Sequence, residues 1–329
     1  MQKTYSIFKN GKYVNPFGST NKTFGDMVSY LWNRPKVLPL TEHEKTHVHP
    51  VLPVDFDKIA SDYDPTTTIR STWIGHSTVL VQMEGYTFIT DPVWSKRCTP
   101  LPGFPAGPAR YRDPPCSIND LPKLDFVILS HNHYDHLDAD AVQQIGNTPK
   151  WFVPKGMKAW FKSVNIDNVI ELDWWEEATF NDDLTLVCTP CQHYSQRTMT
   201  DRYAVLWGSW CVLGKHKRFH FAGDTAKCDV FNEIGHFYGP FDYSLIPIGA
   251  YDLNREFMKT FHCNVPEAVE IHQQLKSKRS MGVHWGTYLL STEPLLEPPT
   301  LLKSESAQAG LKEDEFFASK IGVTTDIIG

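Results

Sequence analysis

The sequence predicts a layered α/β fold in which β-sheets are flanked by helices and an N-terminal extension precedes the main domain. From Ile69 onward, short runs rich in β-branched and aromatic residues are interrupted by stretches with helical spacing. Such a pattern is typical of sheet layers covered by helices. With 329 residues, 41% of them hydrophobic, the chain is long enough to bury one large core.

Residues 1–65 are predicted to form the extension and residues 66–329 the main domain. Six prolines interrupt regular structure in the extension. Apolar residues at 24, 27, 28 and 31 recur at helical spacing, and we expect this face either to pack on the main domain or to contact a membrane surface. The histidines at 43, 47 and 49 are expected to be solvated.

The main domain begins with three predicted strands, 71–74, 78–83 and 86–90, separated by turns at glycines. A long proline-rich loop from Asp91 to Ser117 then leads to a buried strand at 125–129, and loops of this length are usually functional or disordered. The later predicted strands are 151–153, 168–172, 184–188, 202–207, 209–213, 218–222, 243–248 and 281–283, and the predicted helices are 139–145, 157–163, 227–234 and 266–275.

Composition excludes several classes of protein. A net charge of −6 gives no support for nucleic acid as a partner. No apolar run approaches the length of a membrane span, and the start of the chain lacks the apolar core of a signal peptide, so we expect a soluble or peripheral, intracellular protein. Seven scattered cysteines indicate a reducing compartment with free thiols, and we interpret the C-x-x-C pair Cys188 and Cys191 as core or near-site thiols.

The strongest chemical signal is the run His131-Asn132-His133-Tyr134-Asp135-His136, which directly follows the buried strand at 125–129. His131 and His133 are two residues apart, so in extended backbone they point the same way and can hold one metal ion. Asp135 and His136 follow where the chain turns and can face a second ion. Nitrogen and oxygen ligands without thiolates suit zinc or iron in a hydrolytic role better than a structural zinc cluster.

Three further ligand-type residues each follow an apolar strand: His193, Asp224 in a Gly-Asp-Thr turn, and His284. Taken singly, each has an ordinary explanation as a core histidine or a turn aspartate. Together they fit a common edge, because sheets present ligands where their strands end. The sequence therefore predicts a metal site assembled from four separated segments.

This order of residues resembles the metallo-β-lactamase superfamily of binuclear hydrolases over about residues 68–300. The resemblance implies an αββα sandwich and two Zn²⁺ ions per chain. It assigns His131, His133 and His193 to one zinc, Asp135, His136 and His284 to the other, and Asp224 as the bridge between them. Iron or manganese would also fit these ligands.

A closer resemblance is to the phospholipases D that hydrolyse N-acylphosphatidylethanolamine. It is carried by Trp73-Ile74-Gly75-His76, Trp174-Trp175-Glu176-Glu177, Pro247-Ile248-Gly249-Ala250-Tyr251 and His284-Trp285-Gly286-Thr287, among other stretches. The resemblance implies that Tyr134 and His262 contact the substrate head group, although the neighbours of His262 depart from the family pattern. It also implies a homodimer on the cytosolic face of an intracellular membrane.

The expected reaction is attack of a metal-bound hydroxide on phosphorus, which releases N-acylethanolamine and phosphatidic acid. Asp135, His262 and Asp91 are expected to matter most for catalysis, with His262 either a proton donor or a head-group contact. Asp91 is expected to orient a metal ligand or the bridging water, and His76 either does the same or hydrogen-bonds within its turn. Two alternatives stay open: a hydrolase of the same fold acting on a small soluble ester, lactone or phosphodiester, and a metal-holding protein without activity.

Overall fold

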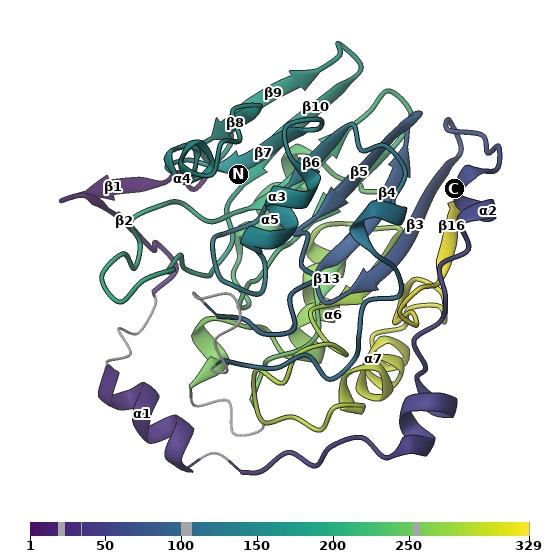
Figure 1. Ribbon diagram of the computed structural model, residues 1–329. Coiled ribbons are helices and arrows are strands. Elements are labelled where there is room, and N and C mark those ends of the chain that lie inside the picture. The colour runs from purple at the N-terminus through teal and green to yellow at the C-terminus, as the bar shows by residue number, and fades with distance from the viewer. Residues whose placement is uncertain (19–23, 34, 100–106, 253–256, 329) are drawn as a thin grey trace.

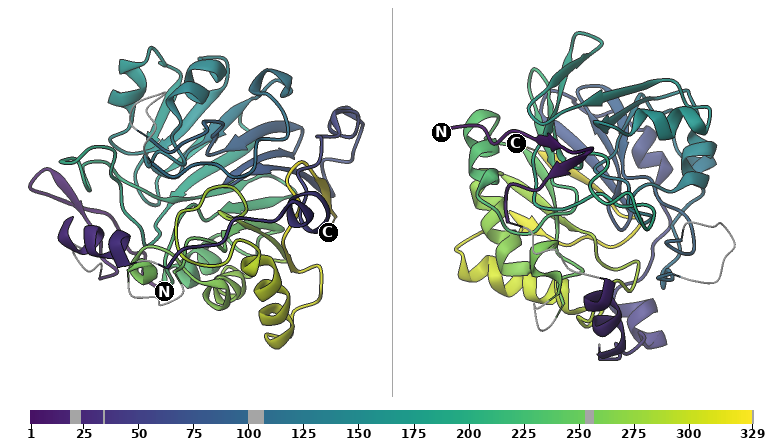
Figure 2. Two further views of the ribbon diagram at one scale, coloured as in Figure 1. Left: turned by 60° about the horizontal axis from the view of Figure 1, so that its bottom comes forward. Right: turned by 90° about the vertical axis from the view of Figure 1, so that its left-hand side faces the viewer.

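Two seven-stranded sheets lie face to face in the computed structural model, with helices on both outer faces (Figure 1). The structure describes residues 1–18, 24–33, 35–99, 107–252 and 257–328, without the side chains at 24, 27, 28 and 31. Both views in Figure 2 show the green and yellow helices on one side of the sheets and the teal helices on the other. The predicted αββα layering is therefore confirmed.

The first sheet has the order β16-β3-β4-β5-β6-β7-β8. Its strands are β3 (Thr68–Gly75), β4 (Thr78–Met83), β5 (Tyr86–Thr90), β6 (Phe126–Ile128), β7 (Lys150–Pro154), β8 (Val169–Leu172) and β16 (Thr324–Ile328). Strands β5 to β8 run parallel. In β4, Val79 and Val81 belong to the core between the sheets, whereas Leu80 belongs to the outer cluster. This alternation follows from the period of two along a strand and allows both faces of the sheet to be buried.

The second sheet has the order β15-β14-β13-β12-β11-β10-β9. Its strands are β9 (Glu177–Phe180), β10 (Leu184–Thr189), β11 (Ser209–Leu213), β12 (Arg218–Phe221), β13 (Tyr243–Pro247), β14 (Arg279–Val283) and β15 (Phe316–Phe317). Strands β12 to β15 are parallel, and β11 is antiparallel to both β10 and β12, so β10 and β12 point the same way. The ends of β10, β12 and β14 therefore reach one edge of this sheet.

Helices cover the outer face of each sheet. The first is covered by α2 (Phe56–Ala60), α3 (Ala139–Ile145) and α4 (Lys158–Ser163), which contribute Ile59, Val142 and Phe161 to the outer cluster. The second carries α5 (Val230–Phe237), α6 (Val265–Gln274) and α7 (Glu297–Gln308). Helix α6 begins at a reciprocal capping box formed by Asn264 and Glu267, which satisfies backbone N–H groups at its start. The short helices are η1 (Glu44–Val48), η2 (Ile118–Asp120) and η3 (Met258–Thr260).

The N-terminal segment contains the hairpin of β1 (Ile7–Lys9) and β2 (Lys12–Val14), followed by α1 (Phe24–Asn33). The hairpin turns at Asn10-Gly11, where both residues have positive φ as a two-residue type I′ turn requires. The segment contacts the main domain, because the indole of Trp175 donates to Thr4 O at 2.8 Å and Tyr13 N donates to Tyr203 O at 2.8 Å. No helix in the described ranges combines the length and apolar character needed to cross a membrane.

Several predicted elements were wrong or missed. Residues 202–207, predicted as a strand, form a turn and irregular structure, and Leu206 is buried there with its N–H donating to Lys155 O at 2.9 Å. The apolar run thus reflects packing against the end of β7 rather than pairing within a sheet. The hairpin β1–β2, strand β9 and all regular structure after residue 296 were missed. Strands β15 and β16 pair with β14 and β3, which are distant in sequence, whereas β1–β2 and β9 are short segments that pair with their neighbours in the chain.

Candidate metal centre

Five loops meet where parallel-running strands end. They follow β5 at Asp91, β6 at His131–His136, β10 at His193, β12 at Asp224 and β14 at His284. An isolated bridge between Gln192 and Ala226 ties the loop after β10 to the loop after β12. The common direction of these strands explains why side chains up to 193 residues apart, from Asp91 to His284, can converge at one edge.

The first cluster contains His131, His133, His193 and Asp224, whose possible ligand atoms all lie within 4.8 Å of one another. Nδ1 of His133 lies 2.8 Å from Nε2 of His131 and 3.2 Å from Nε2 of His193. Oδ2 of Asp224 lies 3.8 Å and 3.6 Å from the same two Nε2 atoms. Three ring nitrogens and one carboxylate oxygen thus lie close enough together to bind one metal ion.

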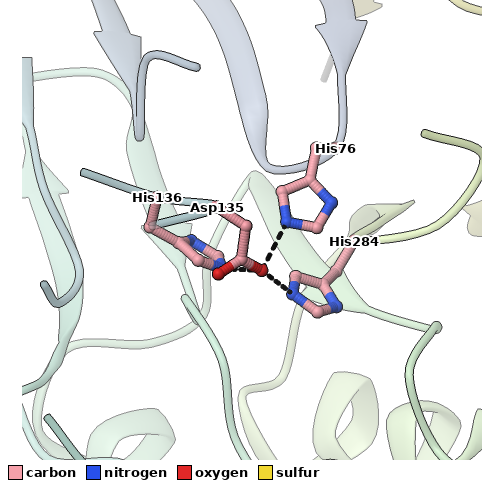
Figure 3. Close-up of side chains that lie close together, drawn as sticks. All are labelled: His76, Asp135, His136 and His284. Atoms are coloured by element: carbon pink, nitrogen blue, oxygen red, sulfur yellow. Dashed lines mark hydrogen bonds and ion pairs between the residues drawn. The ribbon is translucent and has the colours of Figure 1, made fainter. Parts of the chain in front are cut away.

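The second cluster contains Asp135, His136, His284 and His76, again within 4.8 Å (Figure 3). Oδ2 of Asp135 lies 3.4 Å from Nε2 of both His136 and His284, and 3.0 Å from Nε2 of His76. Figure 3 shows the three rings approaching this carboxylate from three sides. A single carboxylate oxygen therefore lies at the centre of this cluster.

Asp224 lies between the two clusters. In addition to its contacts in the first, its Oδ2 is 3.2 Å from Nε2 of His136 and its Oδ1 is 3.1 Å from Nε2 of His284. The seven residues that the sequence analysis assigned as metal ligands are thus brought together by the structure. Among described atoms, Nε2 of His136, Nε2 of His284 and Oδ1 of Asp224 are buried without a hydrogen-bond partner.

Burial and mutual interaction set the charge of these groups. Burial lowers the pKa of His133 to about 3 and that of His193 to about 4, so both rings are neutral at pH 7 and their nitrogens are free to bind a metal. Burial acts to raise the pKa of Asp224, but His136 and His284 outweigh it and hold this pKa well below its usual range. The first cluster therefore combines neutral imidazoles with an ionised carboxylate. In the second cluster, burial acts to lower the pKa of His136 and His284, but the nearby carboxylates outweigh it and raise both pKa values.

Asp91 and Ser130 support the ligands from behind. Nδ1 of His136 donates to Oδ2 of Asp91 at 2.6 Å, while Ser130 donates to the same carboxylate from N at 2.7 Å and from Oγ at 2.5 Å. Because the Ser130 hydroxyl proton is directed at Asp91, Oγ accepts from Nδ1 of His131 at 2.9 Å. Nδ1 of His193 donates to Phe261 O at 2.8 Å. Such partners orient metal-binding histidines in known sites.

The roles of Ser130 and the Phe261 carbonyl were missed by the sequence analysis. Ser130 could have been noticed from its position directly before His131. The Phe261 carbonyl leaves no side-chain signal, because any residue at that position would supply the same acceptor.

His76 occupies a tightly held turn beside Asp135. Its φ is +53°, and its backbone N–H donates to Oγ1 of Thr287 at 2.7 Å. Its carbonyl accepts from the Trp73 indole at 2.9 Å and from His284 N at 3.1 Å. His284 and Asp91 also have positive φ, of +64° and +33°. Positive φ strains the backbone of a non-glycine residue, and such strain often accompanies functional sites.

The two proposed head-group contacts lie in different surroundings. His262 is buried beside the clusters, with Nδ1 4.0 Å from Oδ2 of Asp224 and its ring stacked on His284. Tyr134 is half-buried, its hydroxyl donates to Arg197 O, and the Arg197 guanidinium lies 4.3 Å from the centre of its ring. His262 thus adjoins the ligand set, whereas Tyr134 is fixed by the segment after His193.

The expectation that His49 is solvated was wrong. His49 is buried, its Nε2 donates to Ser319 O at 3.0 Å, and its ring lies edge-on against Trp285 at 4.6 Å. The extension therefore packs behind the loop that carries His284. Cys188 and Cys191 are free and buried, as predicted for core thiols.

Comparison with known proteins identifies the class to which this fold and site belong. Residues 86–285 match the family model described as a beta-lactamase superfamily domain, and the chain therefore belongs to that superfamily. A solved structure, isothiocyanate hydrolase from Delia radicum gut bacteria, superposes with a TM-score of 0.64 at 21% identity over 79% of this chain and all of that one. At this identity the likeness shows the fold alone.

Two curated relatives narrow the identification. N-acyl-phosphatidylethanolamine-hydrolyzing phospholipase D 1 of Caenorhabditis elegans is 44% identical over 95% of this chain and 92% of its own length. The mitochondrial N-acyl-phosphatidylethanolamine-hydrolyzing phospholipase D of Saccharomyces cerevisiae is 35% identical over 78% of this chain, which spans 55% of the yeast protein. The chain belongs to the family of N-acyl-phosphatidylethanolamine-hydrolyzing phospholipases D, as the sequence resemblance predicted.

Proposed function

We propose that this protein is a phosphodiesterase of phospholipase D type that hydrolyses N-acylphosphatidylethanolamine to N-acylethanolamine and phosphatidic acid. The observation that carries the proposal is the convergence of seven ligand-type side chains in a chain that resembles the nematode enzyme over nearly its full length. A protein with this fold but without activity would not need all seven ligand-type side chains.

Two zinc ions are the proposed cofactors, and the residues present fit them. His131, His133 and His193 would hold one ion and Asp135, His136 and His284 the other, with Asp224 shared. The fit rests on buried ligand atoms that lack hydrogen-bond partners among described residues and on a donor set of nitrogen and oxygen only. When bound, such ions lower the pKa of a water and offset the charge of a phosphodiester.

The remaining residues of the site are proposed to position the ligands or to contact substrate. Asp91 orients His136, and His76 holds the carboxylate of Asp135 through its 3.0 Å contact. His262 is proposed as the proton donor to the leaving alkoxide or as a head-group contact, and Tyr134 as a second head-group contact. Replacement of His262 by alanine separates its two roles, because loss of a proton donor lowers kcat by roughly 10²–10⁴, whereas loss of a contact raises KM.

We further propose that the protein is a homodimer bound peripherally to the cytosolic face of an intracellular membrane. Trp32 at the end of α1 is 88% exposed, and an indole on an exposed helix end is suited to the interface between lipid and water. Tyr30 stacks on Phe257 at 4.6 Å, which ties part of α1 to the main domain. The apolar side chains at 24, 27, 28 and 31 lie outside the described residues. Flotation of wild type and Trp32→Ala with vesicles tests the membrane binding. Light scattering of the purified protein tests the homodimer.

The central experiment incubates purified protein of known metal content with N-acylphosphatidylethanolamine in micelles and identifies the products by mass. We expect N-acylethanolamine and phosphatidic acid, and in ¹⁸O-labelled water we expect the label in phosphatidic acid, because water attacks phosphorus and the P–O bond to the ethanolamide breaks. Asp135→Asn should lose nearly all turnover. Label in the ethanolamide alcohol, or normal rates in Asp135→Asn, would refute the mechanism. Turnover of small soluble esters without turnover of the lipid would favour the alternative hydrolase.

A further inference from the structure

His284 differs from three other proposed ligands in the surroundings of its second ring nitrogen. His131, His136 and His193 each direct Nδ1 to an acceptor within 2.9 Å, at Ser130, Asp91 and Phe261 respectively. Among the described residues, Nδ1 of His284 is buried without a hydrogen-bond partner. Figure 3 shows the second nitrogen of this ring facing away from Asp135 and therefore away from the proposed metal.

A small cavity lies behind His284. It has a volume of about 10 Å³, and its walls include His284, Tyr111, Ala250 and Glu293. A single water needs roughly 10–15 Å³ of such volume and two or more polar partners. The cavity is thus at the lower limit for one water and too small for a larger ligand.

Glu293 offers an acceptor at this cavity. Its Oε1 accepts from Ala250 N at 2.6 Å, which fixes the carboxylate against the segment after β13. Its Oε2 is buried and, within the described part of the chain, has no hydrogen-bond partner. A buried polar atom without a hydrogen-bond partner costs free energy, and the two residues that carry these atoms both line the cavity.

We propose that one ordered water in this cavity accepts a hydrogen bond from Nδ1 of His284 and donates one to Oε2 of Glu293. Glu293 is then a positioning residue that orients His284 through the water. The inference rests on the proposed metal centre and deepens it, because a carboxylate behind a ligand histidine fixes the ring and strengthens its second nitrogen as a ligand. Burial raises the pKa of Glu293, and a hydrogen bond from the water would favour the ionised form.

The test compares Glu293→Gln with Glu297→Gln. In Glu293→Gln the amide oxygen can still accept from Ala250 N, but its NH₂ group faces the water with a donor in place of an acceptor. Glu297 is the matched control, since its Oε2 accepts from the Tyr251 hydroxyl in the same segment and it does not line the cavity. Zinc affinity, measured by chelator competition, should fall about 10–100-fold in Glu293→Gln and stay unchanged in Glu297→Gln.

Other outcomes overturn the inference. Equal zinc affinity in wild type and Glu293→Gln excludes a positioning role, and equal losses in both variants assign the effect to the shared segment. If Glu293→Gln does not fold, a high-resolution crystal structure of the wild type decides, because a dry cavity contradicts the proposed water. A folded wild type that binds no metal at all overturns the proposed metal centre itself, which is a distinguishable failure.

Discussion

At the scale of single residues, Asp91 shows how a carboxylate that is not itself a proposed ligand can orient one of the ligands. It is fully buried, and burial raises its pKa, which means that the ionised form must be stabilised by its neighbours. Those neighbours are two donors from Ser130 and one from His136. The same contacts that make the buried charge tolerable also fix the orientation of a proposed metal ligand.

Asp91→Asn should therefore weaken metal binding. An asparagine amide presents NH₂ to at least one of the three donors that Asp91 accepts, which leaves two donors facing each other. We expect metal affinity and turnover to fall roughly 10–100-fold. Asp138→Asn is the control, because Asp138 accepts from Trp94 N, Ser95 N and Ser95 Oγ and contacts no proposed ligand. Chelator competition on both variants measures the effect, and equal affinities would contradict the role given to Asp91.

At the scale of elements, the site depends on how closely strand ends approach one another. Gly249, just after β13, lies so near the end of β14 that a Cβ there would be 2.2 Å from His284 O and 3.0 Å from Trp285 Cβ. Only glycine leaves space for the backbone that carries His284. The separation of two strand ends thus sets the position of a ligand.

Gly249→Ala should displace His284 and lower metal affinity as well as stability, the latter by about 1–3 kcal/mol or more as overpacking usually does. Gly282→Ala is the matched control, because its Cβ would meet Cδ1 of Ile248 at 2.5 Å, a side-chain end that can move. We expect this control to lose stability without a comparable loss of metal affinity. Zinc titration and urea unfolding of both variants measure the two effects, and tight zinc binding by Gly249→Ala would disprove the steric argument.

At the scale of the whole molecule, the core contains histidines that belong to no site. His220 on β12 is fully buried beside Phe231 and Phe241, and neither of its ring nitrogens has a hydrogen-bond partner among the described residues. Burial lowers its pKa to about 3. The folded protein therefore keeps this ring neutral in a pH range where the unfolded chain binds a proton.

The sign of the pH effect follows from this difference. The unfolded ring gains a proton below about pH 6.5 and the folded ring only near pH 3, so stability falls as the pH drops between these values by about 1.4 kcal/mol per pH unit. Urea unfolding at pH 7 and pH 5 should show His220→Phe losing about 2 kcal/mol less than wild type. Other buried histidines and any metal contribute to both proteins alike. Identical losses would show that His220 is not neutral in the fold.

Much of the ligand set could be predicted because its signals are local. His131 to His136 form one run after a buried strand, and Asp224 stands in a Gly-Asp-Thr turn directly after another. What supports the ligands could not be predicted in the same way. His136 is held by Asp91, 45 residues away, and His193 by the carbonyl of Phe261, 68 residues away. His49 was misjudged because its burial depends on Ser319 and Trp285, far along the chain.

The sequence alone determined most strands of the main domain, the ligand types at their ends and the family to which the chain belongs. These follow from side-chain period, turn chemistry and short motifs, all of which act within a few residues. Only the tertiary structure decided which second ring nitrogens find acceptors, that Asp224 lies between the two clusters, and that Glu293 borders a cavity behind His284. Such contacts arise from the relative placement of two packed sheets, and this placement is not encoded in any local sequence pattern.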